Sequence, residues 1–234
     1  PVMVAATVSI AFISLGVWAH HMFTVGMTSI GNTFFAISTM IIAVPTGIKI
    51  FNWLGTMYGG KIRLDTPMLF CIAFLFQFLI AGLTGIMLSV APFDWQLSDS
   101  YFVVAHFHYV ILGGIVFGIF AGFYYWYPKA FGRMLSEKLG HWHFWIFFAG
   151  MHLTFDPQHF AGILGMPRRI FTYEAGRGWE FWNQMSTVGV FLQGIAVIIF
   201  ASQLKDLLGI TLAREPGELI PKLQALAGAL HTIR

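Results

Sequence analysis

Long apolar stretches separated by short polar segments make up most of this chain. Six of them are long enough to cross a bilayer about 30 Å thick, which takes roughly 20 helical residues. We predict membrane-spanning helices at Val4–Phe23, Phe34–Met57, Met68–Val90, Phe102–Tyr127, Trp142–Leu164 and Phe181–Leu204. Tryptophan and tyrosine mark several of their ends, as is typical of a membrane–water interface. The pattern therefore indicates an all-α, polytopic transmembrane helix bundle.

Both ends of the chain bear on its organisation. We predict a transmembrane core over residues 1–204 and a more polar tail over residues 205–234. Four leucines of the tail share one helical face, which favours a short amphipathic helix: Leu219, Leu223, Leu226 and Leu230. The chain is apolar from Pro1 onward, so we expect it to be part of a longer polypeptide.

The composition supports a membrane protein. Of 234 residues, 57% are hydrophobic and 10% are charged, whereas soluble domains have about 25% charged residues. We therefore expect lipid around the chain, and the net charge of +3 does not predict a nucleic-acid partner. The single cysteine, Cys71, provides no disulfide framework and no cysteine-based metal site.

The charges of the predicted loops orient the bundle. The second and fourth loops hold Lys61, Arg63, Lys129, Arg133 and Lys138, and the positive-inside rule places both on the cytoplasmic or matrix side. The fifth loop, on the other side, nevertheless contains the adjacent pair Arg168 and Arg169. Guanidinium groups bind carboxylates in a bidentate way, so we interpret this pair as holding an anionic group. Contact with lipid headgroups is the alternative.

Two histidines, His106 and His108, stand one residue apart in the apolar segment YFVVAHFHY. Side chains two positions apart on an α-helix point about 200° away from each other. The pair cannot bind one ion from one face, but it can serve two cofactors on opposite sides of the helix. Ordinary hydrogen bonds to neighbouring helices are the alternative.

A second pair, His20 and His21, ends the first predicted span. Adjacent helical residues differ by about 100°, so both rings reach one metal only from the side or at a frayed helix end. Neutral imidazole suits copper, iron or zinc, and such a site needs a third ligand from elsewhere. An interfacial histidine pair without metal is the alternative.

Lys49 lies inside a predicted span, with Thr46 and Thr39 on the same helical face. An intramembrane lysine either pairs with an acid or relays protons, while a snorkelling lysine near the helix end is the alternative. In the fifth span, His152 and Asp156 are four residues apart, and we expect them to form a local ion pair. Lining of a water-filled cavity is the alternative.

Five segments, WAHHMFTVGM, PTGIKIFNW, YFVVAHFHYV, PQHF and GMPRR, occur in an order and at separations that resemble subunit I of the haem–copper terminal oxidases. The resemblance covers roughly residues 3–200 and implies the last six helices of a twelve-helix core. It implies a catalytic subunit that reduces dioxygen to water with electrons from cytochrome c or quinol and pumps protons. Ligands of the family that lie upstream are absent, so we expect this chain alone to be inactive.

The same resemblance implies roles for the histidines. His20 and His21 match two copper ligands, His106 the axial ligand of the high-spin haem, and His108 one axial ligand of the low-spin haem. The expected cofactors are therefore copper and two haems, of the a type.

Further site residues follow from the resemblance. Lys49 and Thr46 match a proton path from the cytoplasmic side, and Arg168 and Arg169 match the pair that holds the haem propionates. Asp99 matches a magnesium ligand, although Ser98 stands where the family has a second ligand, a histidine. The implied partners are oxidase subunits II and III. We expect a bacterial cell membrane, with the mitochondrial inner membrane as the alternative.

Three other functions are less consistent with these residues. Nitric oxide reductases of the same superfamily resemble the pattern only at the histidines, so Lys49 with Thr46 argues against them. A transporter without haem has no reason to place GMPRR against the charge bias. A dihaem cytochrome b pairs its ligands about 13–14 residues apart, whereas these stand two apart.

Overall fold

The computed structural model describes residues 1–208, so the predicted tail helix lies outside the described residues. The described residues form helices α1 Val2–Ser14, α2 Ser29–Ile41, α3 Ala43–Met57, α4 Thr66–Ser89, α5 Ala91–Leu97, α6 Tyr101–His108, α7 Phe117–Phe131, α8 Glu137–Ile163 and α9 Glu180–Leu208, with a 3₁₀ helix η1 at Trp18–Met22 and a π-helix η2 at Tyr109–Val116. This confirms the all-α fold.

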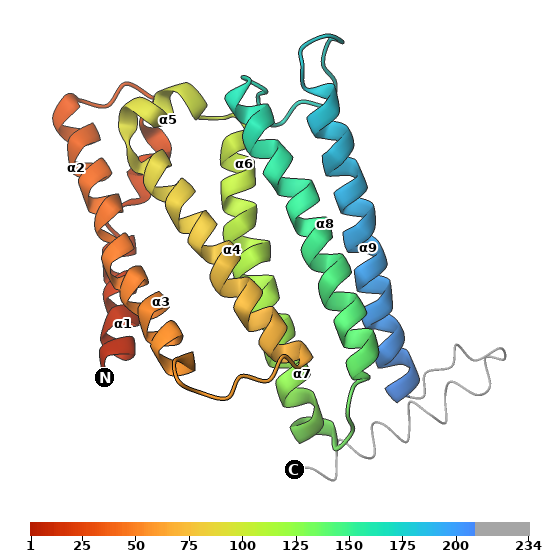
Figure 1. Cartoon of the computed structure of the whole chain (residues 1–234). Coiled ribbons are helices and arrows are strands. Elements are labelled where there is room, and N and C mark those ends of the chain that lie inside the picture. The colour runs from red at the N-terminus through yellow and green to blue at the C-terminus, as the bar shows by residue number, and fades with distance from the viewer. Residues whose placement is uncertain (209–234) are drawn as a thin grey trace, which may run out of the picture.

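The long helices lie side by side as a bundle (Figure 1). Four stretches in the described part are long and apolar enough to cross a membrane: Ser29–Met57, Thr66–Ser89, Tyr101–Phe131 and Glu180–Leu204. Helix α8 has 27 residues and the length to cross as well, but its histidines make it less apolar. In Figure 1 the N-terminus, the end of α3 and the start of α8 lie at one end of the bundle, with α5 and the α8–α9 loop at the other. The two loops predicted to be cytoplasmic thus share one end.

The first predicted span is wrong in its second half. Helix α1 ends at Ser14, and the chain turns before η1 begins at Trp18. Gly16 lies at this break, where the amide donates to the carbonyl of Ile13 at 2.9 Å instead of continuing the α-helical pattern. Glycine in a helix costs about 1 kcal/mol relative to alanine, which favours the break. As a result, His20 and His21 lie on η1 and not on a membrane-spanning α-helix.

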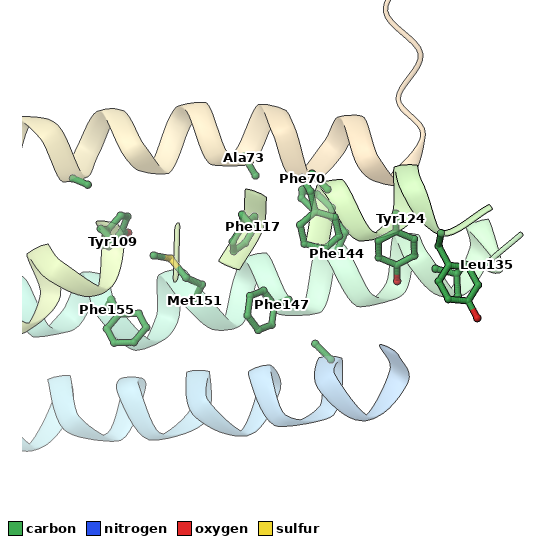
Figure 2. Close-up of a cluster of buried hydrophobic side chains, with 14 residues drawn as sticks. Phe70, Ala73, Tyr109, Phe117, Tyr124, Leu135, Phe144, Phe147, Met151 and Phe155 are labelled. Atoms are coloured by element: carbon green, nitrogen blue, oxygen red, sulfur yellow. The ribbon is translucent and has the colours of Figure 1, made fainter. Parts of the chain in front are cut away.

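A buried aromatic core joins α4, α7 and α8 (Figure 2). The ring centre of Phe70 lies 5.3 Å from that of Phe117 and 5.0 Å from that of Phe144. Because lipid is as apolar as these side chains, close packing rather than water exclusion holds such helices together. The core therefore fixes α6 and α7, which continue from one another through η2, against α4 and α8.

Glycines allow α8 to approach its neighbours. A Cβ atom on Gly150 would lie 2.9 Å from the carbonyl oxygen of Gly189 on α9, and one on Gly162 would lie 2.1 Å from the backbone nitrogen of Phe102 on α6. Real Cβ atoms do not come so close, so these backbone contacts require glycine.

Two loops meet at the end of the bundle where α6 begins. Ser100 and Pro167 form an isolated antiparallel β-bridge. The amide of Tyr101 donates to the carbonyl of Met166 at 3.0 Å, and the amide of Arg168 donates to the carbonyl of Asp99 at 2.8 Å. The bridge thereby fixes Arg168 beside the start of α6.

Candidate functional site

A cavity of about 420 Å³ lies between η1, α2, α3, α4 and α6. His20, His21 and His106 line it together with Thr39 and Thr46. Most of the remaining wall is apolar and includes Ile42, Ile50, Phe78, Leu79, Leu83, Ile86, Val103 and Val110. Its size lies within the range of about 300–1,000 Å³ typical of ligand pockets. The adjacent imidazoles of His20 and His21 therefore share one largely apolar chamber with the distant His106.

The 3₁₀ turn brings the rings of His20 and His21 together. Their Nε2 atoms lie 3.1 Å apart. The Thr39 hydroxyl donates to the carbonyl of Phe35 at 2.6 Å, so its oxygen can accept from Nδ1 of His20, 3.2 Å away. This tautomer leaves the lone pair of His20 Nε2 facing His21.

The His20–His21 pair fits a metal. Imidazole nitrogens bind ions such as zinc at about 2.0–2.1 Å, so two nitrogens 3.1 Å apart can bind the same ion. Among the residues that the structure describes, no group of three or more histidine, cysteine or acidic side chains could hold a metal.

His106 lies against α4. Its Nδ1 is 3.0 Å from the Thr84 hydroxyl oxygen, and that hydroxyl can donate to the carbonyls of Ile80 and Ala81. Nδ1–H therefore donates to Thr84, which leaves a lone pair on Nε2 that can bind a metal ion. A Cβ on Gly85 would lie 2.9 Å from Cε1 of His106, so glycine gives the ring its space.

His108 points the other way, as its spacing from His106 predicts. Its Nδ1 lies 2.7 Å from the carbonyl oxygen of Val104, to which it can donate. Its ring stacks on Phe155 of α8, with centres 4.4 Å apart. His108 is not among the residues that line the cavity. The opposite directions are confirmed, while the role of His108 as a haem ligand stays a prediction.

Acidic and basic groups meet at the outer rim of the cavity. Nε of Arg168 donates to Oδ1 of Asp99 at 2.7 Å, and both residues line the cavity. Asp94 is buried beside them, and its pKa rises to about 6, mainly because of burial and further because of the Asp99 carboxylate, while Arg168 opposes the rise. Arg169 is exposed, with φ of 66°. Only Arg168 of the predicted pair reaches the cavity.

Lys49 lies outside the cavity lining, in contrast to Thr46 and Thr39. Its Nζ lies 5.4 Å from the ring centre of Trp53, which in turn contacts Phe74 of α4. Both threonine hydroxyls donate to carbonyls of their own helix, at 2.6 Å and 2.8 Å. The structure therefore brings the threonines, but not the lysine amine, to the chamber.

The sequence did not lead us to Thr84, Gly85 or Asp94. Thr84 and Gly85 were visible only as part of a stretch of small residues in a predicted span, and Asp94 only as a loop charge. The sequence feature that could have indicated a partner for His106 was the threonine directly before a glycine, Thr84 and Gly85, on the span next to the histidine helix.

Comparisons with known proteins show the family of this chain. Residues 1–192 match the family model of cytochrome c and quinol oxidase polypeptide I. Cytochrome c oxidase subunit 1 of Bacillus sp. (strain PS3) is 56% identical over 219 residues, which cover 94% of this chain and 35% of the relative. Quinol oxidase subunit 1 of Bacillus subtilis (strain 168) is 51% identical over 197 residues, or 84% of this chain and 30% of the relative.

A solved structure supports the fold. A haem–copper terminal oxidase dimer determined by cryo-electron microscopy matches with a TM-score of 0.71 at 22% identity, covering 83% of this chain and 40% of that one. The chain thus spans about a third of the length of the curated relatives. The family implies haem and copper as cofactors and a multi-subunit complex in the membrane. This chain belongs to the cytochrome c and quinol oxidase polypeptide I family.

Proposed function

We propose that this chain forms part of the catalytic subunit of a respiratory terminal oxidase, which reduces dioxygen to water and pumps protons. The observation that supports it most is the shared chamber of His20, His21 and His106 in a member of this family. The relatives named above are oxidases by their names, which favours oxygen reduction over nitric oxide reduction.

In this proposal His20 and His21 hold copper, and His106 holds the iron of the high-spin haem. The bound haem and copper supply the electrons that oxygen reduction requires. The chain orients two of the three rings through Thr39 and Thr84, which accept from the Nδ1 atoms of His20 and His106. The apolar walls of the chamber exclude water from the reaction.

We further propose that His108 binds a second haem, of the low-spin kind, on the opposite side of α6. Its Nδ1 can donate to Val104, which leaves Nε2 with the lone pair that a haem iron needs. Both haems are proposed to be of the a type. Arg168, at the rim of the cavity, is proposed to hold a propionate together with Arg169, although Arg169 is exposed in this chain.

Lys49 and Thr46 are proposed to serve proton uptake from the cytoplasmic side. Thr46 and Thr39 line the chamber, and Lys49 lies one turn further towards the end of the bundle that holds the basic loops. A hydroxyl can accept one proton while it donates another, so the threonines can pass a proton onward if their bonds to the helix carbonyls rotate.

We propose oxidase subunits II and III as partners, cytochrome c or quinol as the electron donor, and a bacterial cell membrane as the location. Of the expected magnesium ligands only Asp99 is present, and Arg168 already binds its carboxylate. We therefore propose that Arg168, and not magnesium, neutralises Asp99 here.

Purification of the full-length protein with its partner subunits tests this function. The reduced-minus-oxidised absorption spectrum should show haem a, and oxygen uptake should start with reduced cytochrome c or with quinol. Each donor is tested separately, because the donor that supports oxygen uptake shows whether the protein acts like the cytochrome c oxidases or like the quinol oxidases. Purified protein without haem, or with haem but without oxygen uptake from either donor, contradicts the proposal.

A further inference from the structure

A network of polar side chains lies on the face of α8 that meets η2 and α4. The Tyr109 hydroxyl donates to Oδ1 of Asp156. Nδ1 of His152 lies 3.1 Å from Oδ2 of Asp156 and 2.8 Å from the Tyr109 oxygen. Nε2 of His152 lies 3.5 Å from Nε2 of Gln77 on α4. None of these residues lines the cavity of the candidate site.

Asp156 puts a carboxylate inside a helix of the membrane bundle. An uncompensated charge there is costly, so the carboxylate needs either a proton or a nearby cation. The structure provides the contact with His152 that the four-residue spacing predicts, and this contact is an ion pair when His152 is protonated. In the described part of the chain, Tyr109 from η2 and His159 from α8 are the other titratable groups recorded around Asp156.

Helix α9 packs on the other face of α8. There, the hydroxyl of Ser186 donates to the carbonyl of Thr154, and the amide of Gln193 donates to the Thr154 hydroxyl. The His152–Asp156 pair is therefore bounded by η2 and α4, which contribute Tyr109 and Gln77 to it.

Gln77 can partner two forms of His152. The glutamine is fully buried, and its Oε1 has no hydrogen-bond partner. As oriented, its NH₂ group faces Nε2 of His152, which must then offer a lone pair, so the imidazole is neutral. A half-turn of the amide exchanges its oxygen and nitrogen. The oxygen would then accept from Nε2–H of an imidazolium, and Oε1 would gain the partner that it lacks.

We propose that His152 and Asp156 form a proton-binding site inside the membrane, with Gln77 as an amide that turns when the proton binds. The proton adds to Nε2 of His152. The pair then changes from a net charge of −1, with Asp156 ionised, to zero. Tyr109 donates to Asp156 in both states. The site goes beyond the proposed oxidase function, because it needs neither haem nor copper.

Infrared spectroscopy of the full-length protein in lipid vesicles tests the site. Difference spectra between alkaline and acidic buffer are recorded with isotope labels on the histidine rings and on the glutamine side-chain carbonyls. We expect an imidazole signal, a glutamine carbonyl signal and a carboxylate signal that change together. His152→Asn should remove all three, and Gln77→Met should remove the glutamine signal. Asp156→Asn should remove the carboxylate signal.

Glu174→Gln is the matched control, because its carboxylate is exposed in the α8–α9 loop. It should leave the three signals in place. A wild-type spectrum without the glutamine signal overturns the proposal, and so do signals that survive in His152→Asn. The haem spectrum of the same samples reports on the oxidase function separately: an absent haem band contradicts that function but leaves the infrared result valid.

Discussion

At the scale of single residues, the hydrogen bond at one ring nitrogen of a histidine decides what the other nitrogen can bind. In His106 the bond of Nδ1–H to Thr84 leaves the lone pair on Nε2. In His20 the contact with Thr39 has the same effect. Such partners fix the tautomer and the orientation of a metal ligand, so two threonines are part of the proposed site.

Thr84→Val in the full-length protein should retain the high-spin haem but weaken the bond between its iron and His106. Valine keeps the shape of threonine and removes the oxygen that accepts from Nδ1, which makes the imidazole a poorer ligand. Resonance Raman spectroscopy should show the iron–histidine stretch at lower frequency. Thr56→Val is the control, because the Thr56 hydroxyl is exposed and bonds only its own helix. Identical spectra for all three proteins would count against the role of Thr84.

Asp94→Asn should change how stability depends on pH. The pKa of Asp94 rises from 3.8 to about 6 in the folded chain, so the folded state binds this proton more tightly than the unfolded state. The resulting stabilisation is complete below pH 3.8 and is lost as the pH rises through about 6. The thermal unfolding midpoint of the unaltered protein should therefore fall across this window more steeply than that of Asp94→Asn. Equal slopes would show that Asp94 does not titrate there.

The site residues differ in how far the sequence predicts them. The histidines could be found because imidazoles are conspicuous in apolar spans, and a two-residue spacing fixes opposite directions on any helix. Thr84 could not be found in this way, since most hydroxyls in membrane helices bond their own backbone. The contact of Arg168 with Asp99 depends on a bridge between two loops, which no local pattern indicates.

At the scale of the elements, most helix positions can be predicted from the length of the apolar stretches, whereas the breaks between helices cannot. A run from Val4 to Phe23 is long enough to span, yet the chain leaves the helix near Gly16 and forms η1. Helices α2 and α3 are likewise separated at Ile42, near Pro45, which lacks the N–H that would continue the hydrogen-bond pattern. Both breaks occur next to the candidate site.

Gly162→Ala should loosen the contact between α8 and α6. The added Cβ would meet the backbone of Phe102, which cannot move aside as a side chain could. Overpacking of this kind costs about 1–3 kcal/mol, so the thermal unfolding midpoint of the full-length protein should fall. Gly122→Ala is the matched control, because nothing lies within 4 Å of its added Cβ. An equal effect of the two changes would contradict the close approach of α8 to α6.

At the scale of the whole molecule, opposite ends of the bundle differ in their charged side chains. The end with α5 and the α8–α9 loop holds Arg168, Asp94 and Asp99 at the rim of the cavity. The other end holds the basic loops of the predicted cytoplasmic side. Protons for a site between these ends must cross part of the membrane, and Lys49 lies between the basic loops and the cavity-lining Thr46.

Lys49→Met in the full-length enzyme should slow reduction of the high-spin haem by about a hundredfold, while the haem spectra stay normal. Methionine keeps the length and apolar contacts of the side chain and removes its exchangeable protons. Stopped-flow absorption measures the rate. Lys138→Met, which removes an exposed charge at the start of α8, should leave the rate unchanged. A wild-type rate in Lys49→Met would make Lys49 a membrane-surface lysine that contacts Trp53.

If η1 holds copper beside the haem of His106, the copper-to-haem ratio of the purified full-length protein depends on both histidines of η1. His20→Asn and His21→Asn should each lower this ratio while the haem absorbance is retained, because each removes a converging Nε2. His141→Asn, which changes a partly exposed histidine bonded to Glu137, should leave the ratio as it is. An unchanged ratio in both His20→Asn and His21→Asn would show that η1 does not hold the copper.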